Sequence, residues 1–303
     1  MPPSTATSRR APSLVSVVVP ARNARPEIDE QLEALAVQDY EGSWEVVVSD
    51  NGSTDGLREH LERHPLREKL SLRVVDSADV PGVAHARNIG VREAHGELVA
   101  IADADDRVHP GWLRALVTVA AAHDAVGGVL EVESINPAEV ADSRPARDTT
   151  QQPRMPGFLA IAPGGNMAVW KDVVDTLGGW DESYTTGGGE DWAFALRLQL
   201  EGYTLGYAPD ALIAYRLRGS RRAMWRQAVG YGRAEVRLYK DFRGHGMPRR
   251  SLIALVDTIA YIVLRNPLVP RVIRRNSTSR WLFLTANFVG RVRGSIENRV
   301  FYV

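Results

Sequence analysis

Short apolar runs alternate with helical patterns along the first third of the chain. Four runs rich in Val, Leu and Ile predict strands, at residues 16–19, 45–49, 71–75 and 98–102. The intervening residues 27–37, 57–63 and 83–94 predict helices, each next to a turn or capping signal. Strands that alternate with helices are typical of an α/β sheet, in which right-handed crossovers bring the carboxyl ends of the strands to one edge.

Polar residues follow three of these predicted strands. The first strand leads into Pro20-Ala21-Arg22-Asn23, the second into Asp50-Asn51-Gly52-Ser53-Thr54-Asp55, and the fourth into Asp103-Ala104-Asp105-Asp106. Open α/β sheets bind their ligands at the carboxyl edge. We therefore expect the functional site to lie among these three segments.

The acidic run after the fourth strand suits a metal ion. Because side chains alternate along an extended chain, Asp103 and Asp105 project to one side. Two converging carboxylates match the oxygen ligands that Mg²⁺ and Mn²⁺ prefer. The alternative is a strand end before a helix, with Asp106 or another of the acids facing the helix dipole.

Two common classes of site are excluded by the composition and motifs. The chain has no cysteine, which removes disulfides, thiolate zinc sites and cysteine nucleophiles. The first strand lacks the Gly-x-Gly-x-x-Gly sequence of dinucleotide-binding folds, which argues against NAD. Asp50 is either a hydrogen-bond acceptor for a base or ribose, or part of an ordinary Asx-turn.

Charge is divided unequally along the chain although the net charge is zero. Residues 216–303 hold 19 basic and 4 acidic residues, which leaves 18 basic and 33 acidic residues for 1–215. Residues 225–239 predict a basic amphipathic helix, and the apolar residues 252–264 are too few to span a bilayer. These segments, with arginines at 271–275 and 291–299, indicate either docking on an anionic membrane or helices packed on the acidic body.

The N-terminal sequence bears on location. The first apolar run, residues 14–19, is too short for the core of a signal peptide. We therefore expect a cytoplasmic protein, with the inner face of the plasma membrane as the candidate anionic surface.

Six segments in a fixed order show that the chain resembles the family 2 glycosyltransferases with the GT-A fold. They lie within residues 14–215 and read VSVVVPARN, VVVSDNGSTDG, GVAHARNIGVREAHGELVAIADADD, GGNMAVW, GGWDE and GGGEDW. The resemblance implies an α/β fold of the GT-A type, with a Rossmann-like nucleotide-binding sheet and an acceptor subdomain. We expect a GT-A domain 14–218, with nucleotide-binding and acceptor halves at 14–106 and 107–218. A flexible segment 1–13 is expected before it, and a basic, mainly helical C-terminal extension, 219–303, lies beyond the family's catalytic core.

The resemblance also implies the nucleotide and metal contacts. Asp103 and Asp105 would hold Mn²⁺ or Mg²⁺ on the donor diphosphate. The residues carried over as nucleotide or donor contacts are Pro20, Arg22, Asn23, Asp50, Asn51, Arg87, Asp103, Ala104, Gly165 and Asn166. The histidine that often supplies a third metal ligand is missing after residues 211–217, so His245 is one candidate, and direct binding of the diphosphate by Tyr215 or Arg216 is another.

Catalytic and acceptor residues come from two later motifs. Asp191 matches the family's catalytic base, and Glu190 is the neighbouring candidate, although both acids also suit the first turn of a helix over 192–200. Trp180 and Trp192 are either a platform for the acceptor sugar or buried core residues.

The function implied by the resemblance is transfer of a sugar from a UDP-, dTDP- or GDP-sugar to an acceptor hydroxyl with inversion. The acceptor is expected to be a sugar, a lipid-linked molecule or a natural product. A sugar nucleotidyltransferase is one alternative, but it would normally carry a glycine-rich basic loop after the first strand. A non-catalytic polyanion-binding protein is the other, and nucleic acid is not expected because the acidic body would repel phosphates.

Overall fold

Four parallel strands form the half of the sheet that the sequence predicts. In the computed structural model, which describes residues 9–144, 148–185, 188–270 and 277–303, they stand in the order β3-β2-β1-β4. Their bounds are β1 (Val15–Ala21), β2 (Trp44–Asp50), β3 (Leu72–Asp76) and β4 (Leu98–Ala102). Ala21 pairs with Asp50, and Asp50 pairs with Asp76, so the three strands end flush and their polar loops share one edge.

The second half of the sheet extends it to eight strands in the order β7-β6-β8-β5 beyond β4. These strands are β5 (Arg107–Val108), β6 (Ala125–Glu131), β7 (Asn166–Trp170) and β8 (Leu205–Ala214). β7 runs antiparallel to both β4 and β6. β8 begins and ends earlier than the apolar residues 211–217, after which a metal ligand was expected.

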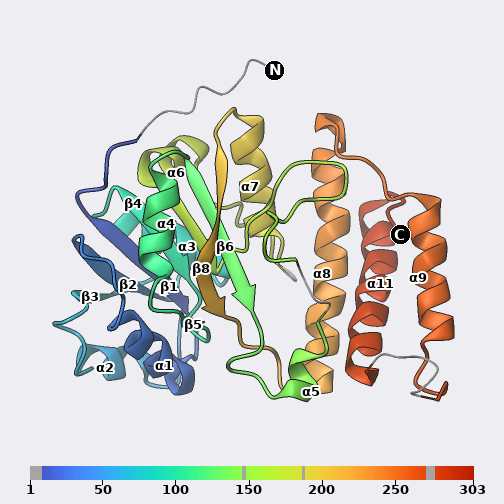
Figure 1. Ribbon diagram of the computed structural model, residues 1–303, viewed down its shortest axis with the longest axis horizontal. Coiled ribbons are helices and arrows are strands. Elements are labelled where there is room, and N and C mark those ends of the chain that lie inside the picture. Colours follow the sequence, from blue (N-terminus) through green and yellow to red (C-terminus); the bar gives the residue numbers. More distant parts are fainter. Residues whose placement is uncertain (1–8, 145–147, 186–187, 271–276) are drawn as a thin grey trace.

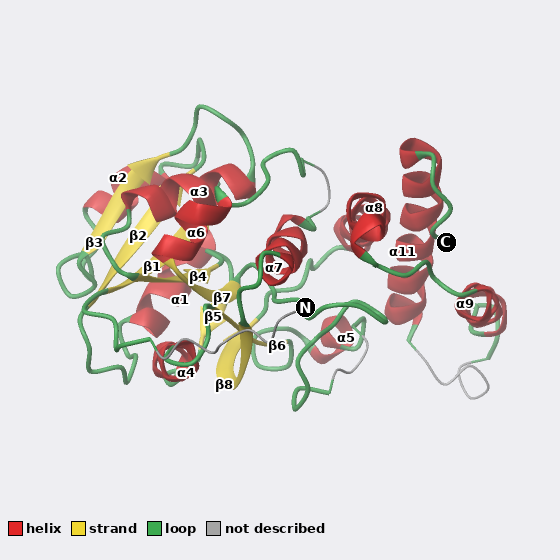
Figure 2. Cartoon of the chain, turned by 90° about the horizontal axis from the view of Figure 1, so that it is seen from above, coloured by secondary structure: helices red, strands yellow, loops and turns green. Residues whose placement is uncertain are grey.

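Helices cover both faces of the sheet, with α3 on one face and α1 and α4 on the other (Figure 2). The helices of this part are α1 (Arg25–Leu35), α2 (Leu57–Glu62), α3 (Val83–Glu93), α4 (Trp112–Ala120), α5 (Ala138–Ala141), α6 (Lys171–Leu177) and α7 (Glu190–Leu200). Apolar strand residues such as Val17, Val47 and Ile101 are fully buried beneath them.

The C-terminal helices stand beside the sheet in the order α8, α11 and α9 (Figure 1). They are α8 (Arg221–Phe242), with the short 3₁₀ turn η1 (Arg243–His245) after it, α9 (Leu252–Leu264) and α11 (Thr278–Asn298). Serine caps the start of each α-helix, and the hydroxyls of Ser220, Ser251 and Ser277 each accept a backbone N–H three residues on. None of the described helices combines the length and apolar character needed to cross a bilayer.

Region 219–303 shares a core with the preceding body. One buried cluster joins the body residues Tyr184 and Leu196 to Val236, Phe242 and Tyr302. α8 packs on apolar side chains of α7, so the preceding body and α8 share one hydrophobic core. At the other end of the chain, Arg9 binds Asp124 and Asp172, so only residues 1–8 of the expected flexible segment lie outside the described residues.

Candidate active site

Four segments converge at the carboxyl edge of the sheet. Arg87 of α3 donates from Nη1 to Oε1 of Glu190 at 2.6 Å and from Nη2 to Oδ1 of Asp103 at 3.3 Å. Arg87 and Glu190 are 3% and 4% exposed. Burial opposes the charge on Arg87, but Asp103 and Glu190 outweigh it and raise the pKa of the guanidinium. The buried arginine therefore links the end of β4 to the start of α7.

Two glycines allow this close approach. A Cβ atom at Gly164 would lie 2.7 Å from Nη1 of Arg87, and one at Gly165 would lie 2.4 Å from Oδ2 of Asp103. Residues 164 and 165 thus press their backbone against Arg87 and Asp103 immediately before β7. Only a residue without a side chain can occupy the position of Gly165.

Asp191 is held beside this cluster by backbone donors. Its Oδ2 accepts the N–H of Gly164 and its Oδ1 accepts the N–H of Trp192, both at 2.8 Å. The side chain stays partly exposed. Burial and the neighbouring Glu190 raise the pKa of Asp191 to about 7, against the opposing effect of Arg87. A carboxylate with this pKa suits proton abstraction near neutral pH.

Three carboxyl groups, those of Asp103, Asp105 and Asp106, lie close together after β4. Burial and the nearby Asp103 raise the pKa of Asp105. Asp106 is fully buried, Oδ1 accepts the N–H of Arg216 at 2.8 Å, and Oδ2 has no hydrogen-bond partner among the described residues. Burial, then Asp103 and Asp105, raise the pKa of Asp106 to about 9. The oxygen donors and their incompletely balanced charge fit a hard divalent cation.

The segment after β8, where the family often supplies a histidine as third metal ligand, carries arginines in this chain. Nη1 of Arg218 contacts Oδ2 of Asp105 at 3.2 Å, and Arg216 pairs with Glu30 at 2.6 Å. Arg218 precedes α8, whereas His245 follows it, and 22 helical residues separate helix ends by about 30 Å. The expectation that His245 joins Asp103 and Asp105 is therefore wrong. Tyr215, considered with Arg216 for direct binding of the diphosphate, bonds through its hydroxyl to Tyr231 at 3.2 Å.

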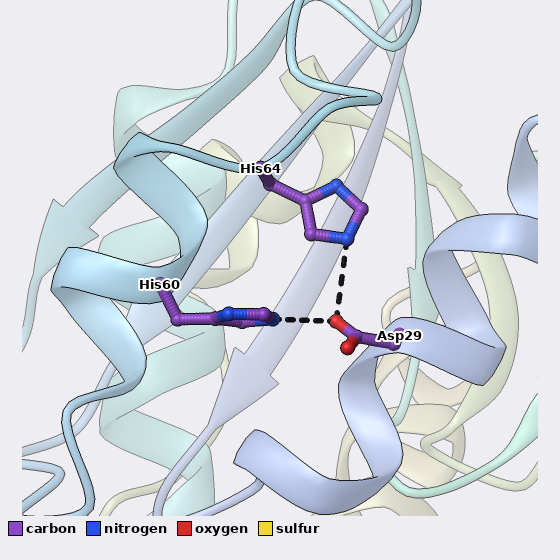
Figure 3. Close-up of side chains that lie close together, drawn as sticks. All are labelled: Asp29, His60 and His64. Carbon is purple, nitrogen blue, oxygen red and sulfur yellow. Dashed lines mark hydrogen bonds and ion pairs between the residues drawn. The ribbon is translucent and has the colours of Figure 1, made fainter.

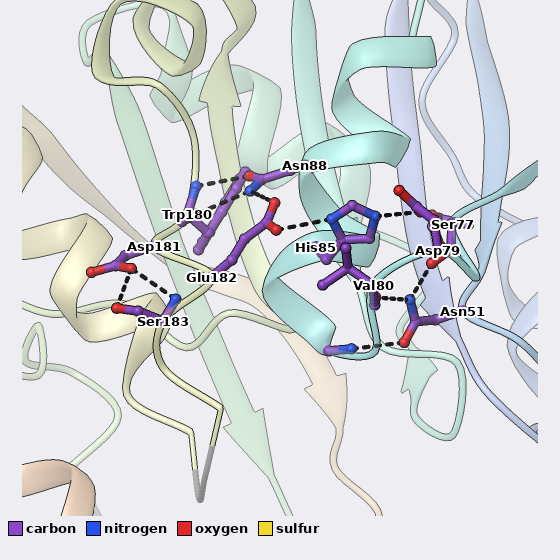
Figure 4. Close-up of polar contacts among 12 residues, drawn as sticks. Asn51, Ser77, Asp79, Val80, His85, Asn88, Trp180, Asp181, Glu182 and Ser183 are labelled. Atoms are coloured by element: carbon purple, nitrogen blue, oxygen red, sulfur yellow. Dashed lines mark hydrogen bonds and ion pairs between the residues drawn. The ribbon is translucent and has the colours of Figure 1, made fainter.

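Loops after β1 and β2 are tied together by the residues expected to bind the nucleoside. Asn23 has a φ of 53° and its Oδ1 accepts the N–H of Thr54 at 2.7 Å. Asp50 is buried, and its Oδ1 accepts the N–H of Ser53 at 2.9 Å. This hydrogen bond belongs to a local turn, the alternative to base or ribose binding that the sequence left open for Asp50. Asn51 binds the backbone of Val80 and Gly82 in the next loop (Figure 4). Pro20 is buried at the end of β1, and Arg22 is exposed at the same edge.

Two residues expected to touch donor or acceptor, Asn166 and Trp180, are core residues, and a third, Trp192, is partly buried. Asn166 is fully buried, accepts from Nε1 of Trp112 at 2.8 Å, and donates to the carbonyls of Val129 and Ala211 at 2.9 Å. Trp180 is 2% exposed and stacks on Phe194 at a ring distance of 4.5 Å. Trp192 is partly buried against the cluster shared by the body and α8. Asn166 and Trp180 therefore serve packing, because both side chains face the interior.

A second polar network joins α3 to the segment before α7 (Figure 4). His85 contacts Asp79 through Nε2 at 2.8 Å and Glu182 through Nδ1 at 2.9 Å. Asn88 exchanges two hydrogen bonds with the backbone of Trp180. Burial lowers the pKa of His85, but its two acidic partners outweigh this effect and raise it.

A separate cluster of Asp29, His60 and His64 has ligand atoms within 4.8 Å of one another (Figure 3). Oδ1 of Asp29 lies 2.6 Å from Nε2 of His60 and 3.2 Å from Nε2 of His64. Nδ1 of His64 accepts the N–H of Leu66 at 3.2 Å, so Nε2 carries the proton of a neutral ring and donates to Asp29. This arrangement favours a hydrogen-bonded triad over a metal site. Gln31, which binds the carbonyl of Asp103, lies about 200° around α1 from Asp29, so the triad faces away from the acids.

Arg218 and Gln31 are the site residues that the sequence analysis missed. Gln31 is fully buried and bonds to the backbone of both Asp103 and Val108. In the sequence, Gln31 could have been found as a polar residue on the buried face of the helix predicted at 27–37. Arg218 could have been found by its position just after β8, where a third metal ligand was expected.

Two family models match the chain. They are glycosyl transferase family 2, over residues 16–178 and thus more than half of the chain, and glycosyl transferase family group 2, over residues 98–289. Glycosyltransferase AglE of Haloferax volcanii is 30% identical over 226 residues, which are 73% of this chain and 73% of AglE. The probable glycosyltransferase YdaM of Bacillus subtilis is 25% identical over 233 residues, which are 72% of this chain and 54% of YdaM.

Solved structures agree with this assignment. The mannosyltransferase PcManGT of Pyrobaculum calidifontis, in complex with GDP-Man and Mn²⁺, has a TM-score of 0.57 and 25% identity over 96% of this chain and 89% of PcManGT. Residues 1–349 of TarS of Staphylococcus aureus, in complex with UDP, have a TM-score of 0.53 and 18% identity over 95% of this chain and 93% of the TarS 1–349 chain. The fold is therefore that of the GT-A glycosyltransferases, as expected from the sequence. With the acids of β4 and α7 gathered at one sheet edge and a family match over more than half its length, the chain belongs to glycosyl transferase family 2.

Proposed function

We propose that the protein transfers a sugar from a nucleotide diphosphate donor to an acceptor hydroxyl, with Asp191 as the base. The convergence of Asp103 and Asp191 around Arg87 and Gly164 carries this proposal. It joins a candidate diphosphate site to a candidate base within one cluster. PcManGT, which is similar over most of its length, was solved with GDP-Man and Mn²⁺.

Asp103 and Asp105 are the proposed ligands of Mn²⁺ or Mg²⁺. When bound, such an ion neutralises the charge that grows on the leaving diphosphate. Arg218 contacts Asp105 and its side chain is half exposed, so its guanidinium is available to bind a donor phosphate oxygen. Asn23, Asp50 and Asn51 shape the loops that would receive the nucleoside.

Asp191 would take the proton of the acceptor hydroxyl as that oxygen attacks the anomeric carbon. Bond formation on one side of the sugar and departure of the nucleotide on the other is a single displacement, which inverts the anomeric centre. Glu190 is buried and paired with Arg87, so its role in this scheme is to position the cluster. The acceptor is a sugar, a lipid-linked molecule or a natural product, and a cytoplasmic location next to a membrane belongs to the same proposal.

Product analysis tests the reaction class. Incubation with a panel of UDP-, dTDP- and GDP-sugars and Mn²⁺ should release the free nucleoside diphosphate. Pyrophosphate as the product would instead identify a sugar nucleotidyltransferase, the rival that shares metal-binding acids. Absence of any released nucleotide across donors and acceptors, with no donor binding, would favour a non-catalytic polyanion-binding protein.

The Asp105→Asn variant tests the metal site. The substitution removes one carboxylate, so Mn²⁺-dependent binding of the nucleoside diphosphate should weaken about tenfold or more while the fold persists. Calorimetric titration measures the affinity, and Asp175→Asn on the exposed face of α6 is the matched control. Equal affinity in the two variants would remove Asp105 from the metal site.

A further inference from the structure

α9 presents an apolar face to solvent. Exposed fractions of Leu252, Ile253, Val256, Val263 and Leu264 lie between 62% and 74%. At 100° per residue these five side chains, with Ile259, occupy one side of the helix. Single exposed apolar residues are ordinary, but a continuous apolar face of this kind marks an interaction surface.

The opposite side of α9 is where the helix meets the rest of the protein. Nε1 of Trp281 on α11 donates to the carbonyl of Ile262 at 2.9 Å, and Leu255 and Ile262 are partly buried. Figure 1 shows α9 as the outermost helix, on the far side of α11 from the sheet. The exposed face therefore points away from the catalytic body and, among the described residues, stays uncovered.

Arginines flank α9 in the sequence. Arg249 and Arg250 precede the helix, Arg249 is exposed and Arg250 pairs with Glu235 at 3.9 Å, and Arg265 follows the helix. Residues 243–303 hold 11 arginines against Asp257 and Glu297. An exposed apolar helix face in a segment with this excess of arginine has the charge and polarity of a helix that lies in the interface of an anionic membrane.

Helix length decides the orientation. Thirteen residues span about 20 Å, whereas the hydrocarbon core of a bilayer is about 30 Å thick. α9 is thus too short to cross but long enough to lie in the membrane plane, with its apolar face toward the acyl chains and its arginines at the headgroup phosphates.

We propose that the exposed face of α9 is a docking surface for an anionic bilayer. This proposal rests on the membrane location included in the proposed function, whereas sugar transfer is tested separately by nucleotide release. The two can therefore fail independently. A second copy of the chain is the rival occupant, but arginines on both faces of a symmetric contact would repel each other.

Sedimentation with vesicles tests the surface in the full-length protein. The protein should sediment with phosphatidylglycerol-rich vesicles, much less with phosphatidylcholine vesicles, and less in 0.5 M than in about 0.05 M salt, because salt screens the arginines. Val263→Asp should lower the bound fraction several-fold, and the double variant Val256→Asp/Val263→Asp should abolish binding.

Val37→Asp is the matched control, because Val37 on the catalytic body is 60% exposed and Val263 is 62% exposed. Val37→Asp should bind vesicles like the unchanged protein, and all variants should keep the same thermal midpoint and the same affinity for a nucleoside diphosphate. Three results would overturn the proposal: no sedimentation of the unchanged protein, equal loss in Val37→Asp, or a dimer in sedimentation velocity that Val263→Asp converts to a monomer.

Discussion

At the scale of single residues, the surroundings of Asp191 set its chemistry. A base must be deprotonated, and the pKa of Asp191 is raised to about 7 by burial and by Glu190. Turnover should therefore fall about tenfold per pH unit as the pH drops below 7, and level off above it. A pH profile of the turnover rate measures this, and an acid limb centred near pH 4 would contradict it.

The substitution Asp191→Asn separates binding from catalysis. Donor affinity should persist, because Asp191 is proposed to contact the acceptor and not the nucleotide, while turnover falls about 10²-fold or more. The amide oxygen of Asn can accept the N–H of Gly164 or of Trp192, but not both. Initial rates and titration of the donor supply the two readings. Near-normal rates in this variant, beside an inactive Glu190→Gln, would move the base one residue earlier.

His85 makes a contribution to stability that depends on pH. Its folded pKa is raised by Asp79 and Glu182, which outweigh the effect of burial, so the contribution is fully present below the unfolded value of about 6.5 and is lost as the pH rises through the folded value. His85→Gln should lower the thermal midpoint by about 2–4 °C at pH 5.5 and by less at pH 9.

The exposed His245 supplies the control for His85. His245→Gln should leave the midpoint unchanged at both pH values, because no ion pair or hydrogen bond of its side chain is present among the described contacts. An equal effect of His85→Gln at pH 5.5 and 9 would show that the network acts without a charged imidazole.

At the scale of elements, the sequence predicted the parallel half of the sheet and missed most of the other half. β1, β2 and β4 are continuous apolar runs, which is typical of strands covered on both faces. β6 contains Gly127-Gly128, a pair typical of turns, but here Gly127 makes room for Ala162, since a Cβ would approach it within 2.7 Å. That need is set by a neighbour distant in sequence and has no local signal.

The same reasoning applies to the candidate site. Asp103, Asp105 and Asp191 are in motifs, so their proposed roles could be read from the sequence. Asn166 also lies in a motif, but its partners Trp112, Val129 and Ala211 are 37 to 54 residues away, and only the folded chain shows that they bind its side chain completely within the core.

Helix packing between α8 and α11 depends on glycine. A Cβ at Gly290 would lie 2.2 Å from the carbonyl oxygen of Val229, which cannot move without shifting the helix. Gly290→Ala should therefore reduce the free energy of unfolding by about 1–3 kcal/mol. Denaturant unfolding measures it, with Gly219→Ala as the control because a Cβ there meets nothing within 4 Å. Equal stability of both variants would contradict the close crossing.

At the scale of the whole molecule, some basic residues of the C-terminal part form ion pairs with acids of the body. Arg216 pairs with Glu30 and Arg218 pairs with Asp105, so basic residues that begin the C-terminal part hold acids of the body. Near α9, Arg250 pairs with Glu235, whereas Arg249 is exposed beside the ring of Phe301. Internal pairing therefore involves several arginines of the C-terminal part, and the membrane proposal adds the exposed Arg249 at the start of α9.

The shared core predicts that body and C-terminal helices unfold together. Tyr302 is 2% exposed and stacks on Tyr239 at 4.6 Å, in the same cluster as Leu196 of α7. Tyr302→Ala and Leu196→Ala should each cost about 2–5 kcal/mol and lower the midpoint of one common calorimetric transition. Phe301→Ala, at a ring that is 50% exposed, should change it little. Two separate transitions, with Tyr302→Ala moving only one of them, would instead mean that residues 219–303 fold as an independent unit, and a chain ended near Asp241 would then remain soluble.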